Sequence, residues 1–173
     1  MSKHRVQVGP FSFHVENVVL PMGLTVASVD VTGEGATAID KPFSLTLVSP
    51  GKLVAEVMEF DLASFLEAQA PGGLHEFAVS AQNGKLAVRA KKTVLVDLKV
   101  AAVASLRIKD GKQMWIDVES VDVMGAGAKN LVQGQIDKIN PVLDVADLPI
   151  PARLETVTVA DGKVVLRGTA SPP

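Results

Sequence analysis

The sequence of 173 residues has no cysteine, no tyrosine and a single tryptophan. The absence of cysteine excludes disulfides, zinc sites with thiolate ligands and thiol catalysis. Aromatic residues make up only 4% of the chain, so the bases of a single strand would find few rings on which to stack. These absences narrow the candidate functions to ones that need neither cysteine chemistry nor stacking.

Charge of one sign and long hydrophobic runs are also scarce. Seventeen basic residues face nineteen acidic ones, for a net charge of −2, and no basic block extends beyond Lys91-Lys92. Nucleic acid is therefore not an expected partner. No run of 18 uncharged apolar residues predicts a transmembrane helix. The first eight residues lack the apolar segment of a secretory signal, so we expect a cytoplasmic location, or the cell envelope if a leader has been removed.

Apolar residues are abundant instead. They form 47% of the chain, with a mean hydropathy of +0.29. A chain of this length is expected to form one domain, here residues 1–173, with a substantial core. The apolar surplus must either fill that core or line a ligand site, and composition leaves both alternatives open.

Three turn signals predict β-hairpins. Asn83-Gly84, Asp110-Gly111 and Asp161-Gly162 are each followed by lysine and flanked by alternating apolar residues, and such pairs favour type I′ turns with positive φ at both positions. The expected strand pairs are 76–82 with 85–91, 94–109 with 112–123, and 154–160 with 163–169. The middle hairpin is long, and a shift in its apolar alternation predicts a β-bulge near Ser120.

Helices and further strands complete the predicted order. A helix is expected over 62–69, capped by Asp61 and ended by Pro71-Gly72-Gly73, and a second over 126–139, stopped by Pro141. Strands are expected over 11–20, 24–32, 43–48 and 52–58, separated by prolines. The predicted fold class is α+β, one long curved antiparallel sheet built from hairpins that wraps two amphipathic helices.

Candidate catalytic groups are few. His4, His14 and His75 have no spacing typical of metal ligands, so no metal or cofactor is predicted. Asp117 and Glu119 alternate on the outward face of a strand, where solvated acids are common. An enzyme would require both carboxylates to converge with a histidine in one cleft, and we do not predict one.

The order of elements resembles a known family. The segments that carry the resemblance are Asp61–Glu67, Phe77–Arg89, the long hairpin, Ile139-Asn140-Pro141 and the closing Leu148–Gly168 with its Pro-x-Pro and Asp-Gly. Together, over residues 45–170, they are similar to the LmeA-like family of bacterial phospholipid-binding proteins, whose fold is similar to tubular lipid-binding (TULIP) domains. The resemblance implies an apolar groove that contacts lipid tails, and no catalytic residue.

The leading hypothesis is therefore non-catalytic binding of a phospholipid, a fatty-acyl ligand or a similar amphiphile, with peripheral membrane contact and a role in lipid transport or envelope maintenance. Burial of an acyl chain contributes about 0.8 kcal/mol per methylene without any charged contact. The predicted lipid contacts are all apolar: Leu62, Phe65 and Leu66; Val96, Leu98, Val100, Ile116 and Val118; Leu131, Val132 and Ile136. The alternative is a β-rich structural or protein-interaction domain with a fully packed core.

Overall fold

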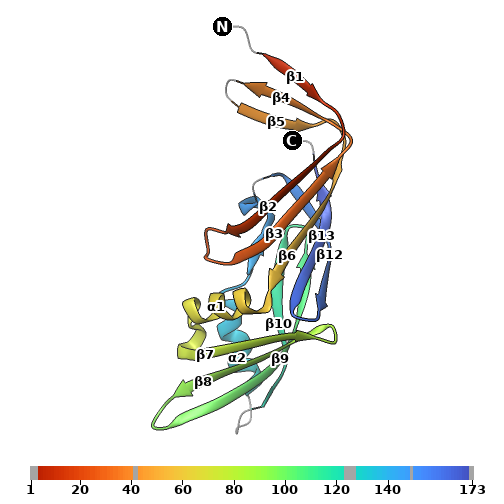
Figure 1. Ribbon diagram of the computed structural model, residues 1–173. Coiled ribbons are helices and arrows are strands. Elements are labelled where there is room, and N and C mark those ends of the chain that lie inside the picture. Colours follow the sequence, from red (N-terminus) through yellow and green to blue (C-terminus); the bar gives the residue numbers. More distant parts are fainter. Residues whose placement is uncertain (1–3, 41–42, 123–127, 149, 172–173) are drawn as a thin grey trace.

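The computed structural model describes residues 4–40, 43–122, 128–148 and 150–171, without the side chains of 43–45 and 128. The molecule is elongated and rich in antiparallel β structure (Figure 1). Its α-helices are α1 (Glu59–Gln69) and α2 (Ala128–Asp137), with single 3₁₀ turns over Pro71–Gly73 and Val145–Asp147. The predicted α+β class is confirmed.

Three antiparallel sheets follow one another along the molecule (Figure 1). The first has the order β1-β4-β5, the second β12-β13-β6-β3-β2, and the third β11-β10-β9-β8-β7. The strands are β1 (Arg5–Val8), β2 (Phe11–Val19), β3 (Thr25–Gly33), β4 (Ala36–Asp40), β5 (Phe43–Leu47), β6 (Gly51–Met58), β7 (Leu74–Gln82), β8 (Lys85–Thr93), β9 (Asp97–Lys109), β10 (Gln113–Asp122), β11 (Leu143–Asp144), β12 (Ala152–Ala160) and β13 (Lys163–Ala170).

The division into three ladders differs from the single sheet that the sequence predicted. In the second sheet, β13 lies between β12 and β6 and pairs with β6 over its whole length. The strands β7–β10 pair only among themselves and with the short β11. A hairpin pairs only the inner edge of each strand, and the alternation within it carries no information about which sheet the outer edges join.

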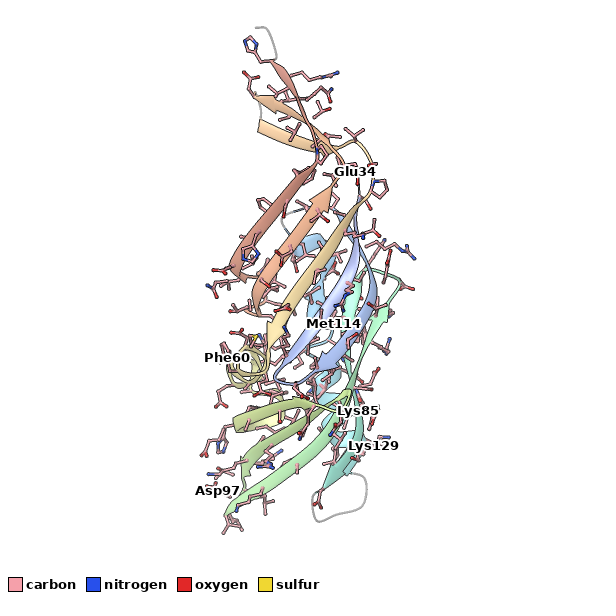
Figure 2. The ribbon with its side chains drawn as sticks, turned by 45° about the vertical axis from the view of Figure 1, so that its right-hand side comes forward. Glu34, Phe60, Lys85, Asp97, Met114 and Lys129 are labelled. Carbon is pink, nitrogen blue, oxygen red and sulfur yellow. The ribbon has the colours of Figure 1, made fainter. Side chains whose placement is uncertain are left out.

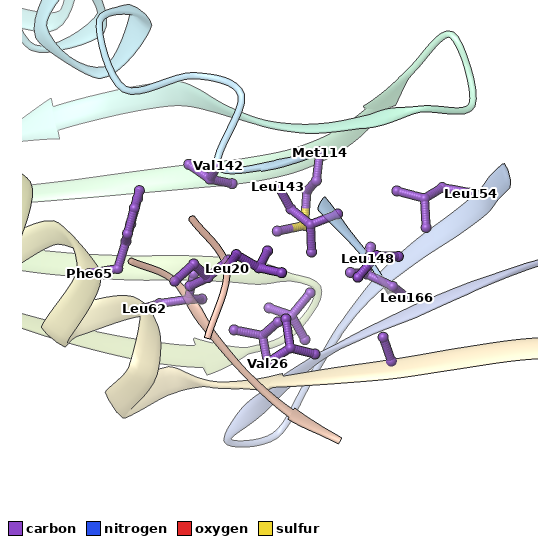
Figure 3. Close-up of a cluster of buried hydrophobic side chains, with 14 of the residues drawn as sticks. Leu20, Val26, Leu62, Phe65, Met114, Val142, Leu143, Leu148, Leu154 and Leu166 are labelled. Atoms are coloured by element: carbon purple, nitrogen blue, oxygen red, sulfur yellow. The ribbon is translucent and has the colours of Figure 1, made fainter. Parts of the chain in front are cut away.

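The packed core lies where the second and third sheets meet. Leu20 and Val26 from the second sheet and its loop lie near Leu62 and Phe65 of α1 (Figure 3). Met114, Leu143, Leu154 and Leu166 extend the same cluster toward β12 and β13. Among the described residues no polar or charged side chain is buried, so hydrophobic burial is what holds the two sheets together.

The predicted hairpins are confirmed, with one difference in turn geometry. Asn83, Gly84, Asp110 and Gly111 all have positive φ, as type I′ turns require. At the third turn only Gly162 does (φ 79°), so this turn is not type I′. The predicted bulge is also present, as a register shift between Val118 and Ser120.

Two predicted element boundaries are wrong. The long strand does not begin at Val94, because 94–96 form the turn between β8 and β9. Asp61 does not cap α1, since the helix begins at Glu59 with Met58 at the N-cap position. Asp61 lies in the first turn instead, where a negative charge interacts favourably with the helix dipole. The predicted start of the second helix at 126–127 falls outside the described residues.

Candidate functional site: an apolar cavity

A small apolar cavity of about 40 Å³ lies between the two helices and the inner face of the β7–β10 sheet. Pockets that hold small molecules are about 300–1,000 Å³, so this cavity has to widen before it can admit an acyl chain. The cavity is narrow, and its walls come from both helices and from four strands. They are formed by Leu62, Leu66, Leu74, Phe77, Val79, Leu86, Val88, Ala90, Val100, Ala102, Ala104, Ile116, Val118, Val132 and Ile136.

The alternation of the strands explains why the part of the sheet that lines the cavity is apolar. In β9, every second residue from Val100 to Ala104 faces the cavity, because successive side chains of a strand point to opposite faces. Ala102 and Ala104 stand where larger side chains would fill the space. The cavity therefore exists because small residues line the middle of the sheet.

Two carboxylates fix α1 against the edge of this sheet. The backbone N–H of Ala81 donates to Glu59 at 2.9 Å, and that of Phe77 donates to Glu67 at 2.8 Å. The hydrogen bond from Phe77 is the main reason that the pKa of Glu67 is lowered. Both bonds reach the free side of the edge strand β7, so α1 takes the place of a further strand.

Side-chain amides attach the α2 segment to the opposite edge. Gln133 accepts from the backbone N–H of Val118 at 2.6 Å. Asn140 accepts from the N–H of Ile116 and donates to its carbonyl, both at 2.9 Å. These bonds occupy β10 beyond its short pairing with β11, so the second helix closes the cavity by hydrogen bonds as well as by Val132 and Ile136.

A second, more open hollow lies beside the cavity and shares part of its wall. It is lined by Gly72, Leu74, Lys92, Val100, Leu131, Val132 and Gln135. Leu74, Val100 and Val132 line both spaces. We call this hollow the mouth. A lysine and an exposed leucine thus lie beside the apolar cavity.

The structure brings seven of the eleven predicted contact residues together. Leu62, Leu66, Val100, Ile116, Val118, Val132 and Ile136 all line the cavity. Phe65 instead belongs to the packed core, at 1% exposure (Figure 3). Contact of the seven cavity residues with a lipid stays a prediction.

The three other predicted contacts lie outside the cavity. Val96 is in the β8–β9 turn and 67% exposed, Leu98 follows at the start of β9 with 43% exposure, and Leu131 is 71% exposed at the mouth. Placing Val96 on the buried sheet face is wrong, because the apolar alternation continues past the point where the strand ends. The apolar stripe of the second helix predicted that Leu131 faces the interior. In the structure only Val132 and Ile136 of that stripe reach the cavity walls, and Leu131 is exposed.

Sequence reasoning named the hairpin of β7 and β8 but not its cavity residues. Phe77, Val79, Leu86, Val88 and Ala90 line the walls. Their alternation with Lys85, Ala87 and Arg89 was a usable signal, because it marks an inner and an outer face in the same way as in β9.

The charged candidates are engaged elsewhere. Arg107 donates to Asp117 at 2.5 Å. Lys85 pairs with Glu119 and is the main cause of the lowered pKa of that carboxyl. His14 of β2 is hydrogen-bonded to Asp30 of β3 and to Glu16 of β2, and His75 is hydrogen-bonded to Thr93. Within the described residues, no group of three or more acids and histidines could hold a metal ion.

The geometry defines a class of protein: a β-rich molecule with two helices that enclose a narrow apolar cavity against a sheet, consistent with a TULIP-like fold. Residues 8–169 match the LmeA-like phospholipid-binding family, and the chain belongs to this family. The predicted resemblance is confirmed and covers nearly the whole chain. No match to a curated protein or to a solved structure was found. In the described part of the chain, no helix is long and apolar enough to cross a bilayer.

Proposed function

We propose that the protein binds one phospholipid molecule non-covalently, with an acyl chain inside the apolar cavity and the polar headgroup at the mouth. The observation that carries the proposal is the cavity lining, in which every residue is apolar. A pocket with so few polar atoms selects for hydrocarbon, since a polar ligand group inside it would lose its hydrogen bonds to water. Membership of a phospholipid-binding family supports the same ligand class.

The role that follows is to hold or carry a lipid without changing it. The cavity walls offer no nucleophile and no acid or base, so they can shield an acyl chain from water but cannot attack an ester. Transfer of phospholipid between membranes, or maintenance of the cell envelope, requires such shielding, and contact with a membrane surface is needed to load the cavity.

We infer that α2 moves outward on loading, because the cavity is narrow and the second helix closes it by a few side-chain bonds.

Filling the cavity tests the proposal. Ala102→Phe places a ring in the cavity, whereas Ala101→Phe places the same ring on the outer face of the same strand, where Ala101 is exposed. Native mass spectrometry after organic extraction should find co-purified phospholipid in the wild-type protein and in the Ala101→Phe control, and strongly reduced lipid in Ala102→Phe.

Overpacking can itself destabilise a protein by about 1–3 kcal/mol. Thermal unfolding of both variants therefore has to show that they remain folded. A wild-type protein that carries no lipid and takes up none from liposomes would overturn the proposal and favour a protein-interaction domain with a packed core.

A further inference from the structure

The turn between β8 and β9 exposes consecutive aliphatic side chains. Val94, Leu95 and Val96 are 62%, 96% and 67% exposed, and Leu98 follows at the start of β9. The turn lies at one end of the molecule, beside the labelled Asp97 in Figure 2 and far from the β1-β4-β5 sheet. Single exposed aliphatics are ordinary, but a contiguous group at an extremity marks a surface that binds something apolar. We call Val94, Leu95, Val96 and Leu98 the apolar tip.

Basic residues surround the apolar tip in a chain whose net charge is negative. Residues 89–101 hold Arg89, Lys91, Lys92 and Lys99 against the single acid Asp97, whereas the whole chain has a net charge of −2. Asp97 accepts a hydrogen bond from Thr93. Glu76 pairs with Lys91, and Asp122 lines the same outer hollow as Arg89 and Lys99. With these two acids counted, this end of the molecule keeps a net charge of about +1 on an acidic protein, which favours an anionic surface as its partner.

The strand register adds an unfavourable contact that such a partner would relieve. Lys91 lies directly opposite Lys99 in the β8–β9 ladder, and like charges in that position destabilise a sheet. Glu76 pairs with Lys91 at 2.5 Å. Among the described residues Lys92 and Lys99 have no ion pair, so both are available to phosphate groups.

The tip is continuous with the mouth of the cavity. Lys92, which lines the mouth, lies opposite Leu98 of the apolar tip in the β8–β9 ladder. Val100 follows along β9 and faces both the mouth and the cavity. Exposed Leu131 lies on the other side of the mouth. Apolar side chains thus extend from the end of the molecule to residues of the cavity wall, with Lys92 beside them.

We propose that the apolar tip inserts into the surface of an anionic phospholipid bilayer, with Lys92 and Lys99 at the lipid phosphates and the mouth facing the bilayer. This inference rests on the proposed function, because it gives the route by which a phospholipid enters and leaves the cavity. Insertion of aliphatic side chains combined with electrostatic attraction is a sufficient basis for reversible membrane binding.

Vesicle sedimentation tests the tip with matched variants. The probes are vesicles of phosphatidylcholine, with and without phosphatidylglycerol. Val94→Asp and Leu95→Asp should each weaken binding to the anionic vesicles about tenfold or more, since a buried leucine contributes roughly 1.5–3 kcal/mol. Val48→Asp is the control, because Val48 is equally exposed (64%) and lies beside β5, away from the tip. Equal binding by Leu95→Asp and Val48→Asp would overturn the proposal.

Charge reversal tests the lysines separately. Lys92→Glu and Lys99→Glu should each weaken binding to the anionic vesicles by about fivefold or more, with little effect on binding to pure phosphatidylcholine. Lys112→Glu makes the same change of net charge at the β9–β10 turn and should have no such effect. A uniform loss for all three variants would show that only net charge matters and would contradict a docking site at the tip.

A soluble lipid separates docking from cavity binding. Short-chain phosphatidylglycerol, kept below its micelle concentration, should bind Leu95→Asp as well as the wild-type protein but should not bind Ala102→Phe, while Ala102→Phe should still sediment with vesicles. Wild-type protein that sediments with vesicles but does not bind the soluble lipid would overturn the cavity function and leave the tip supported. Light scattering that shows a dimer abolished by Leu95→Asp, without vesicle binding, would assign the tip to a second copy of the chain instead.

Discussion

Gly168 shows how closely the strands of the second sheet approach. It lies opposite Leu154, where the register of β12 shifts, and a Cβ atom there would be 2.0 Å from the carbonyl oxygen of Arg153. Gly168→Ala should therefore push β12 away from β13 and lower the free energy of unfolding by at least about 2 kcal/mol, measured by urea denaturation.

Gly134 is the matched control for this change. It lies inside α2, and a Cβ atom there would meet nothing within 4 Å. Gly134→Ala should stabilise the protein by about 0.5–1 kcal/mol, because alanine favours the helix. Similar effects of the two substitutions would contradict the close approach at Gly168.

Glu67 gives the protein a defined response to acid. Its pKa is lowered from the ordinary value of 4.5, first by the hydrogen bond from the N–H of Phe77. A group whose pKa is lower in the folded state stabilises the fold above its unfolded pKa, and this contribution is lost as the pH falls through the folded pKa. The stability difference between wild type and Glu67→Gln should therefore be largest above pH 4.5 and shrink below it, as denaturant titrations at several pH values can measure. A difference independent of pH would contradict this role.

At the scale of elements, the helices act as edges of the β7–β10 sheet. Gln133 occupies the N–H of Val118 and Asn140 that of Ile116, so the α2 segment holds β10 at two independent points. Gln133→Leu leaves the first N–H unpaired, which should cost about 1–3 kcal/mol. Hydrogen exchange at the amide of Val118 should accelerate, while the amide of Ile116 serves as the internal control. Equal acceleration at both amides would indicate general unfolding instead of release of one contact.

The hairpins could be predicted because their information is local. The turns at Asn83-Gly84 and Asp110-Gly111 need positive φ, which few residue pairs tolerate. The change in apolar alternation from Val118 to Val121 predicted the bulge. The contacts of Glu59, Glu67, Gln133 and Asn140 could not be predicted, because each joins two different elements through a residue type that is common on surfaces. The segment Val94–Val96 was predicted as strand although it is a turn, because its local sequence continues the apolar alternation of β9.

At the scale of the whole molecule, ligand binding should appear as stability. A ligand present at 100 times its dissociation constant stabilises the folded state by about 2.7 kcal/mol. For a chain of this size the melting temperature should rise by roughly 5–10 °C. Differential scanning calorimetry with short-chain phosphatidylglycerol can measure the shift, and Ala102→Phe should abolish it. A shift of equal size in that variant would place the lipid outside the cavity.

The pairing of β6 with β13 also has a kinetic consequence. The β7–β10 sheet is built from hairpins whose strands are neighbours in sequence, whereas Glu56 and Lys163, which form an ion pair between β6 and β13, are 107 residues apart. Local contacts form early in folding, and closure of a long loop is slow. The cavity half of the molecule can thus assemble before the second sheet does, and an intermediate with an exposed apolar face would be the species most prone to aggregation.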